Sequence, residues 1–139
     1  MKKVILALLT IVMSTAAYSQ KIKIKRDIAT VDDVAVCKVE DDEVNRGAYY
    51  FSNVETGKKL LYFKWIDYGE FGYFEAYDAD NLDDILFETE AVVGLKKWLV
   101  EKLYVTGALT SSGINKAKLG EFSKKKGREF SRRRSETRN

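Results

Sequence analysis

The chain has 139 residues, of which 45% are hydrophobic and 32% are charged, and its formal net charge is +3 at pH 7. This length suits one domain with its own core. The chain contains no histidine and a single cysteine, which excludes a Ser-His-Asp triad, a histidine-ligated zinc site and an internal disulfide. No glycine-rich phosphate loop occurs, and the acidic run Asp78–Asp84 does not match the EF-hand template. We therefore expect no cofactor and no metal.

The first nineteen residues have the pattern of a cleavable signal peptide. Two lysines precede the mostly apolar stretch Val4–Met13, and the small side chains of Ala17 and Ser19 occupy the positions that signal peptidase requires. We expect cleavage after Ser19, so that residues 1–19 are removed and the product is periplasmic or secreted. A stretch of ten residues rises only about 15 Å as a helix, roughly half of a hydrocarbon core, so no stable membrane anchor is expected after cleavage.

Two strands are expected early in the mature chain. Residues Lys21–Lys25 alternate between lysine and isoleucine, and the turn-forming pair Asp32–Asp33 precedes a second strand over Val34–Glu40. Cys37 lies in that second strand. Its pattern favours a small buried side chain, although an intermolecular disulfide or a reactive thiol is the alternative for an exported protein. The polar stretch 41–47 indicates a loop.

Most aromatic residues of the chain lie in the stretch 49–77. Aromatic side chains favour strands, and glycine-containing breaks at Thr56–Gly57 and Tyr68–Phe71 divide this stretch into three strands. The three strands are expected to pair as consecutive hairpins.

The second of these hairpins has a register that its side chains specify. We expect Asp67 to pair with Gly72. This register places Lys64 opposite Glu75 and aromatic residues opposite one another. One face is then entirely apolar and is expected to meet the core: Leu61, Phe63, Trp65, Phe74 and Ala76. The other face carries Tyr62, Lys64, Ile66, Tyr73, Glu75 and Tyr77.

The remaining elements are one more strand and two helices. Residues 84–88 indicate the last strand, after which Thr89 is expected to cap a long amphipathic helix over about 90–105. A short C-terminal helix is expected to begin at Asn115. The predicted fold class is α+β: an antiparallel β-meander of five or six strands with both helices packed on one face.

Charge divides the mature chain into two parts. Acidic residues prevail up to Glu90, whereas basic residues prevail towards the C-terminus. We expect a single α+β domain over 20–123 and a basic, flexible tail over 124–139. The simpler interpretation is a solvated tail, and the alternative is that the tail binds anionic surface polymers. Nucleic acid is not favoured, because Phe130 is the only aromatic residue in the basic run.

The tyrosine-rich sheet face is the best candidate for a binding site, because tyrosine rings stack on sugars and anchor protein partners. The candidate binding residues are Tyr62, Lys64, Tyr73, Glu75 and Tyr77. The competing interpretation is ordinary packing on the sheet. We therefore expect a non-catalytic binding protein with a protein or glycan partner, and the alternative is a small hydrolase that acts through carboxylates. The sequence leaves the oligomeric state open.

Overall fold

The structure is a computed structural model that describes residues 20–69 and 71–138. The signal peptide predicted for residues 1–19 lies outside the described residues. No helix in the described part of the chain is long and apolar enough to cross a membrane.

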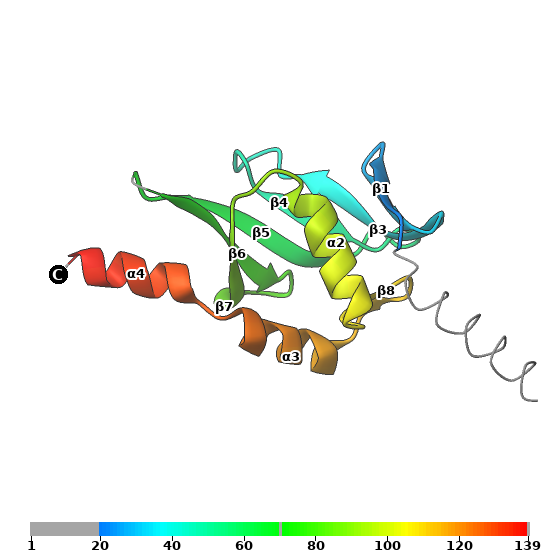
Figure 1. Cartoon of the computed structure of the whole chain (residues 1–139). Helices are drawn as coiled ribbons and strands as arrows, with labels where there is room; N and C mark the ends of the chain where they lie inside the picture. Colours follow the sequence, from blue (N-terminus) through cyan, green and yellow to red (C-terminus); the bar gives the residue numbers. More distant parts are fainter. Residues whose placement is uncertain (1–19, 70, 139) are drawn as a thin grey trace, which may run out of the picture.

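The described chain is an α+β domain built on one antiparallel sheet, whose seven strands follow one another in chain order (Figure 1). The strands are β1 Ile22–Lys25, β2 Ile28–Val31, β3 Val34–Asp41, β4 Tyr49–Ser52, β5 Lys59–Asp67, β6 Gly72–Asp78 and β7 Asn81–Glu90. A small separate hairpin is formed by β8 Leu109–Thr110 and β9 Gly113–Ile114, and the described helices are α2 Leu95–Val105, α3 Lys116–Lys126 and α4 Glu129–Arg138. The meander is confirmed, but the predicted number of strands and the single long helix are not matched.

The additional strand arises from tight turns that lack glycine. The β1–β2 turn is Arg26-Asp27 and the β2–β3 turn is Asp32-Asp33, and all four of these residues have positive φ angles between 49° and 67°. Such two-residue turns match the twist of a hairpin but usually contain glycine or asparagine. The Arg26-Asp27 turn therefore carries no obvious sequence signal, and β2 was not predicted.

The β5–β6 register agrees with the prediction at every pair, from Asp67 opposite Gly72 to Tyr62 opposite Tyr77. Four of the five residues expected to meet the core do so, whereas Trp65 is only half-buried and lies outside the core cluster. The fully buried members Leu61, Phe63 and Ala76 belong to the same core as residues of α2 and α3. That core also contains Cys37, which is fully buried and whose pKa burial raises to about 12.

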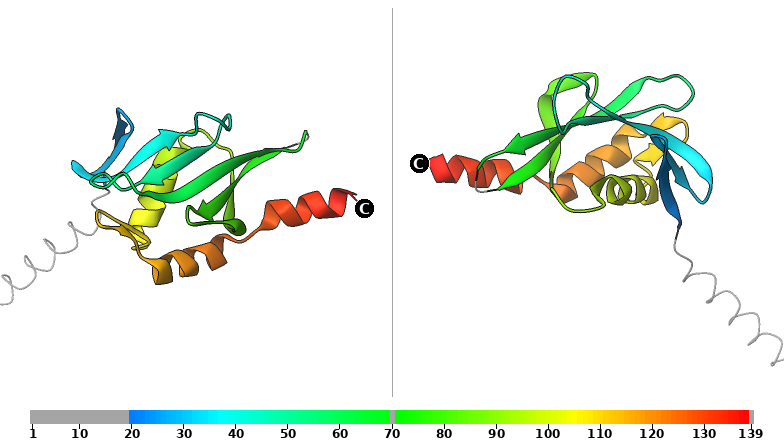
Figure 2. Two further views of the ribbon diagram at one scale, coloured as in Figure 1. Left: turned by 180° about the vertical axis from the view of Figure 1, so that it is seen from behind. Right: turned by 90° about the horizontal axis from the view of Figure 1, so that it is seen from above.

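Helix α2 lies across one face of the sheet, with α3 beside it (Figures 1 and 2). Its buried residues are Leu95, Leu99, Val100 and Leu103. The helix begins later than predicted, because β7 continues to Glu90. Thr89 is buried and pairs with Phe74 in the sheet, so it does not cap the helix. The residue before α2 is instead Gly94, whose φ of 76° suits glycine. The predicted start of α3 is confirmed, since the Asn115 side chain accepts a hydrogen bond from the Lys118 N–H.

The C-terminal segment passes around the outer edge of β7 from one face of the sheet to the other. On the α2 side, Phe122 of α3 packs edge-on against Phe87. At the edge, the Glu88 N–H donates to the carbonyl of Gly127 at 3.0 Å. Beyond it, Phe130 of α4 lies on the opposite face, stacked on Tyr73 with centroids 5.3 Å apart. The segment expected to be a flexible tail is therefore largely helical, and α4 rests on the tip of the β5–β6 hairpin (Figure 2).

Candidate functional site

The structure divides the predicted tyrosine-rich face into a covered part and an open part. Tyr73 is fully buried and Glu75 is 4% exposed. Helix α4 covers this part, because Phe130 stacks on the Tyr73 ring and the Arg134 guanidinium lies 6.0 Å from the centre of that ring. Tyr73 and Glu75, both predicted as binding residues, therefore cannot touch a partner while α4 is in place.

Under α4 lies a pair of buried carboxylates on adjacent strands. Glu75 of β6 and Glu88 of β7 are directly opposite each other in the sheet. The Glu75 carboxylate accepts hydrogen bonds from the hydroxyls of Tyr73 and Tyr77, at 3.3 and 2.9 Å. The Glu88 carboxylate accepts hydrogen bonds from Ser131 of α4. Buried carboxyl groups need such hydrogen-bond partners, and the bonds from Ser131 connect α4 to β7.

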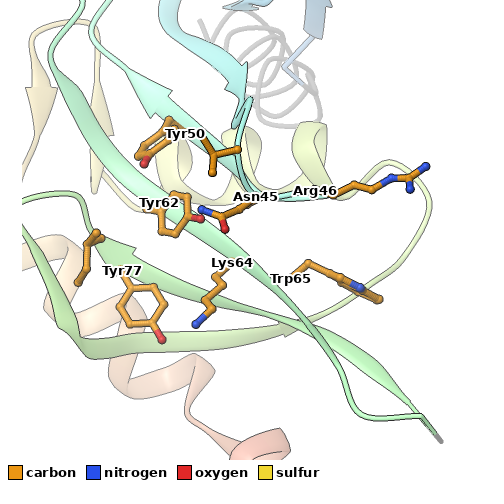
Figure 3. A pocket seen from close by; sticks show the side chains of 10 residues that line it. Asn45, Arg46, Tyr50, Tyr62, Lys64, Trp65 and Tyr77 are labelled. Atoms are coloured by element: carbon orange, nitrogen blue, oxygen red, sulfur yellow. The ribbon is translucent and has the colours of Figure 1, made fainter.

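The open part of the face forms a pocket with a volume of about 450 Å³, which we call the tyrosine pocket. It is lined by Val44, Asn45, Arg46, Ala48, Tyr50, Tyr62, Lys64, Trp65, Tyr77 and Leu82. Figure 3 shows Tyr62, Lys64 and Tyr77 together on one side of the sheet, with Arg46 and Trp65 farther along it. Three of the five predicted binding residues thus line one pocket, although its rings are recessed rather than laid out as a flat platform.

The ring hydroxyls deepest in the tyrosine pocket are already engaged. The Tyr62 hydroxyl donates to Asp42 at 3.1 Å, and the Tyr77 hydroxyl donates to Glu75. Burial is the main cause that raises the pKa of Tyr62 to about 12, and the bond to Asp42 adds to it. Burial, followed by the bond to Glu75, also raises the pKa of Tyr77. Both hydroxyls therefore remain protonated near neutral pH, and the rings offer a ligand mainly their apolar surfaces.

Two cations at the tyrosine pocket lack a carboxylate partner. Lys64 lies opposite Glu75 in the register, but Glu75 is occupied by tyrosine hydroxyls. Within the described residues, neither Lys64 nor Arg46 forms an ion pair within 4 Å. Both side chains belong to exposed residues. The pocket thus combines aromatic rings with two cations that form no ion pair.

Sequence reasoning missed the part of the pocket that comes from outside the hairpin. Asn45 and Arg46 belong to the loop before β4, which the sequence indicates only as a polar loop. Tyr50 comes from β4 and pairs with Tyr62, its ring centre 4.6 Å from that of Tyr62. The alternation of residues in β4 places Tyr50 on the same side as Tyr62, so the sequence did contain this signal.

Trp65 lies at the rim of the tyrosine pocket because of two glycines. A Cβ atom at Gly72 would lie 2.1 Å from the Trp65 ring, and one at Gly47 would lie 3.4 Å from the Trp65 Cβ. The indole therefore covers Gly72 directly and packs against Phe74, with ring centres 5.1 Å apart.

Among the residues that the structure describes, no group of three or more acidic, cysteine or histidine side chains could hold a metal ion.

Comparison with known proteins finds no family model, no curated protein and no solved structure that matches the chain.

Proposed function

We propose that this is an exported, non-catalytic binding protein whose tyrosine pocket takes an acidic saccharide. The proposal rests on one observation: the pocket places two cations, Lys64 and Arg46, beside recessed aromatic rings. Neither cation has an ion-pair partner in the described chain. A sugar ring presents C–H surface to aromatic faces, while a carboxylate suits the guanidinium and ammonium groups.

A saccharide fits the shape of the tyrosine pocket better than a protein partner does. Tyr62 and Tyr77 are only 6% and 8% exposed and cannot anchor a flat surface, whereas the half-buried Tyr50 and Trp65 present the aromatic surface of the pocket that a sugar can reach. A specific protein interface needs about 800 Å² from each partner. A volume of about 450 Å³ instead lies within the range of small-molecule sites.

The distribution of charge at the pocket favours a saccharide that carries a carboxylate. Asp42 and Glu75 near the pocket are occupied by hydrogen bonds from tyrosine hydroxyls. Lys64 and Arg46 are the charged side chains that line the pocket, neither has an ion-pair partner in the described chain, and the carboxylate of a uronic acid would supply one. A neutral sugar would leave them without a partner.

Calorimetry with tri-galacturonate and its fully methyl-esterified form tests this proposal, because esterification removes the negative charges while adding one methyl group to each carboxyl group. We expect the acid to bind and the ester to bind at least about 5-fold more weakly, as expected for loss of one charge-assisted contact. Lys64→Gln should weaken binding of the acid by a similar factor. Lys97→Gln, an exposed lysine on α2, is the matched control and should leave the affinity unchanged. Equal binding of acid and ester, or binding by neither, would contradict the proposal.

Export is the second part of the proposal and depends on the signal peptide predicted for residues 1–19. Expression of the full chain followed by mass spectrometry should show a mature N-terminus at Gln20 in the periplasmic or extracellular fraction. An intact Met1 in the cytoplasmic fraction would count against export and would leave the saccharide test unaffected.

The carboxylate hydrolase gains no support from the buried acidic pair. Glu75 and Glu88 are covered by α4, and both accept hydrogen bonds from side chains of the protein itself.

A further inference from the structure

Helix α4 is held on the sheet by a small set of contacts. Phe130 is the only apolar residue in its sequence, and its ring stacks on that of Tyr73. Ser131 donates hydrogen bonds to the Glu88 carboxylate. The tip of the β5–β6 hairpin adds one hydrogen bond to the helix backbone and two rings beneath its guanidinium groups. A helix of this length is marginal in water on its own, so the helical conformation of α4 depends on the surface on which it docks.

The surface beneath α4 fits a particular kind of segment. It presents the Tyr73 ring to an aromatic side chain, and it presents the Glu88 carboxylate to a backbone N–H and a hydroxyl in the first turn of a helix. This surface carries two carboxylates, because Glu75 lies directly opposite Glu88, whereas three consecutive arginines follow Ser131 in α4. A second copy of this chain carries the same segment and therefore matches the surface in shape and charge.

The link between α3 and α4 consists of Gly127 and Arg128. Gly127 has a φ angle of 74° and a ψ angle of −169°, a combination that is essentially restricted to glycine. A Cβ atom at this position would meet nothing within 4 Å. The backbone conformation of the link, and not crowding around it, is therefore what requires glycine here.

A helical link would separate α4 from its own sheet. If Gly127 and Arg128 became helical, α3 and α4 would merge into one helix over 116–138, about 35 Å long. In the structure α3 packs on one face of the sheet and α4 on the other, on either side of the β7 edge (Figure 2). A straight helix cannot contact both faces, so the merged helix would carry α4 away from the β6–β7 surface of the same chain.

We propose that α4 is an exchangeable arm: in a dimer, each copy has a continuous α3–α4 helix and docks its α4 on the β6–β7 surface of the other. The side-chain contacts of α4 are then remade between the copies, and the exchange is mutual, so it closes at two chains. Opening breaks the bond from the Glu88 N–H to the Gly127 carbonyl. The proposal does not rest on saccharide binding, because no residue of α4 lines the tyrosine pocket.

The native chain should remain a monomer at micromolar concentration. A short link gives α4 an effective concentration on the order of millimolar at its own sheet, which a second copy must exceed. Glycine in the link also disfavours the continuous helix. Short hinges invite exchange when the bent conformation is under strain, so the hinge glycine controls the balance between the two forms.

Replacement of the hinge glycine tests the exchange in the full mature chain. Gly127→Ala should disfavour the bent link by about 5- to 150-fold and favour the continuous helix. Gly127→Gln should act alike, because glutamine is also a good helix former. Size-exclusion chromatography with light scattering should show a dimer of either variant, with a fraction that rises with concentration. Gly120→Ala, which adds a methyl group inside α3 where it also meets nothing within 4 Å, is the matched control and should stay monomeric.

Two further measurements identify α4 as the exchanged element. In the dimer of Gly127→Ala, the amides of α4 should exchange hydrogen slowly, and the exchange should become faster on dilution as α4 is released. Added to Gly127→Ala, Glu88→Gln should weaken the dimer by at least about 10-fold, the loss expected for one hydrogen bond to a charged group. Glu90→Gln, at an exposed position on the same strand, should leave the dimer unchanged.

The proposal is overturned if both hinge variants stay monomeric or lose the folded sheet, or if Gly120→Ala dimerises to the same extent. It is also overturned if Glu88→Gln leaves the dimer of Gly127→Ala as tight as before. None of these results would change the saccharide test, because its variants at Lys64 and Lys97 belong neither to α4 nor to the link.

Discussion

The carboxylate of Glu88 on β7 accepts hydrogen bonds from both the backbone N–H and the hydroxyl of Ser131 in α4, at distances from 2.9 to 3.1 Å. Ser131 lies in the first turn of the helix, where backbone N–H groups lack partners and negative charge is favourable. Glu88 thus caps a helix that lies more than forty residues further along the chain. This contact fixes α4 over Tyr73 and thereby decides which tyrosines remain open to a ligand.

Replacement of Glu88 by glutamine should loosen α4. The variant keeps the size of the side chain but loses its charge and one acceptor, and hydrogen bonds to charged groups contribute about 1.5–3 kcal/mol each. We expect the free energy of unfolding, measured by urea denaturation, to fall by about 1–3 kcal/mol, with faster amide hydrogen exchange in α4. Glu90→Gln, at an exposed position on the same strand, should change it by less than about 0.5 kcal/mol. Equal effects of the two variants would mean that the Ser131 contact does not hold α4.

Gly72→Ala should destabilise the β5–β6 hairpin. The added methyl group would lie 2.1 Å from the rigid ring of Trp65, so the indole must move. Overpacking of this kind costs about 1–3 kcal/mol. Urea denaturation followed by tryptophan fluorescence would report both the loss of stability and the displaced ring. A native fluorescence spectrum identical to that of the unaltered chain would contradict the predicted displacement.

Gly120→Ala is the opposite case and serves as the control. Gly120 lies inside α3, and a Cβ atom there would meet nothing within 4 Å. Alanine is favoured over glycine in a helix by about 0.5–1 kcal/mol, so this variant should be more stable by a similar amount.

The protein should lose stability as the pH rises above about 9. Burial raises the pKa of Cys37 and of Tyr73 to about 12, whereas the same groups in an unfolded chain titrate near 8.5 and 10. A raised pKa in the folded state means that the folded form keeps a proton that the unfolded form has lost. The contribution to stability is therefore complete below the unfolded pKa and is lost as the pH rises towards the folded one.

Two readouts check this alkaline dependence. Absorbance at 295 nm should show that buried tyrosines ionise together with loss of the folded circular dichroism signal. Tyr73→Phe should reduce the slope of unfolding free energy against pH between about 10 and 12. Ionisation of every tyrosine near pH 10 in a protein that is still folded would show that the rings are reachable by solvent.

The sequence was informative at two places where both partners of a contact lie close along the chain. The β5–β6 register followed from residues on either side of one turn, because a slip by one residue would bring Lys64 and Glu75 into the core and put Phe63 into water. The start of α3 followed from Asn115 in the same way. Local chemistry was enough in both cases.

Contacts between distant segments could not be predicted in this way. Nothing around Tyr73 indicates that Phe130 lies on its ring, since charge made the C-terminal run resemble a solvated tail. Thr89 was expected to cap a helix, because its neighbours in the chain do not show that it pairs with Phe74. The loop contribution of Arg46 to the tyrosine pocket was missed for the same reason.

The crossing of the chain around β7 has a consequence for self-association. The Glu88 N–H and the Ile85 carbonyl already have partners in Gly127 and Arg128, so a strand from another molecule would have to displace them before it could add at this border. The opposite border is β1, where exposed lysines alternate with isoleucines and would repel a second copy. A protein built on one broad open sheet is thereby guarded on both flanks against growth into fibrils.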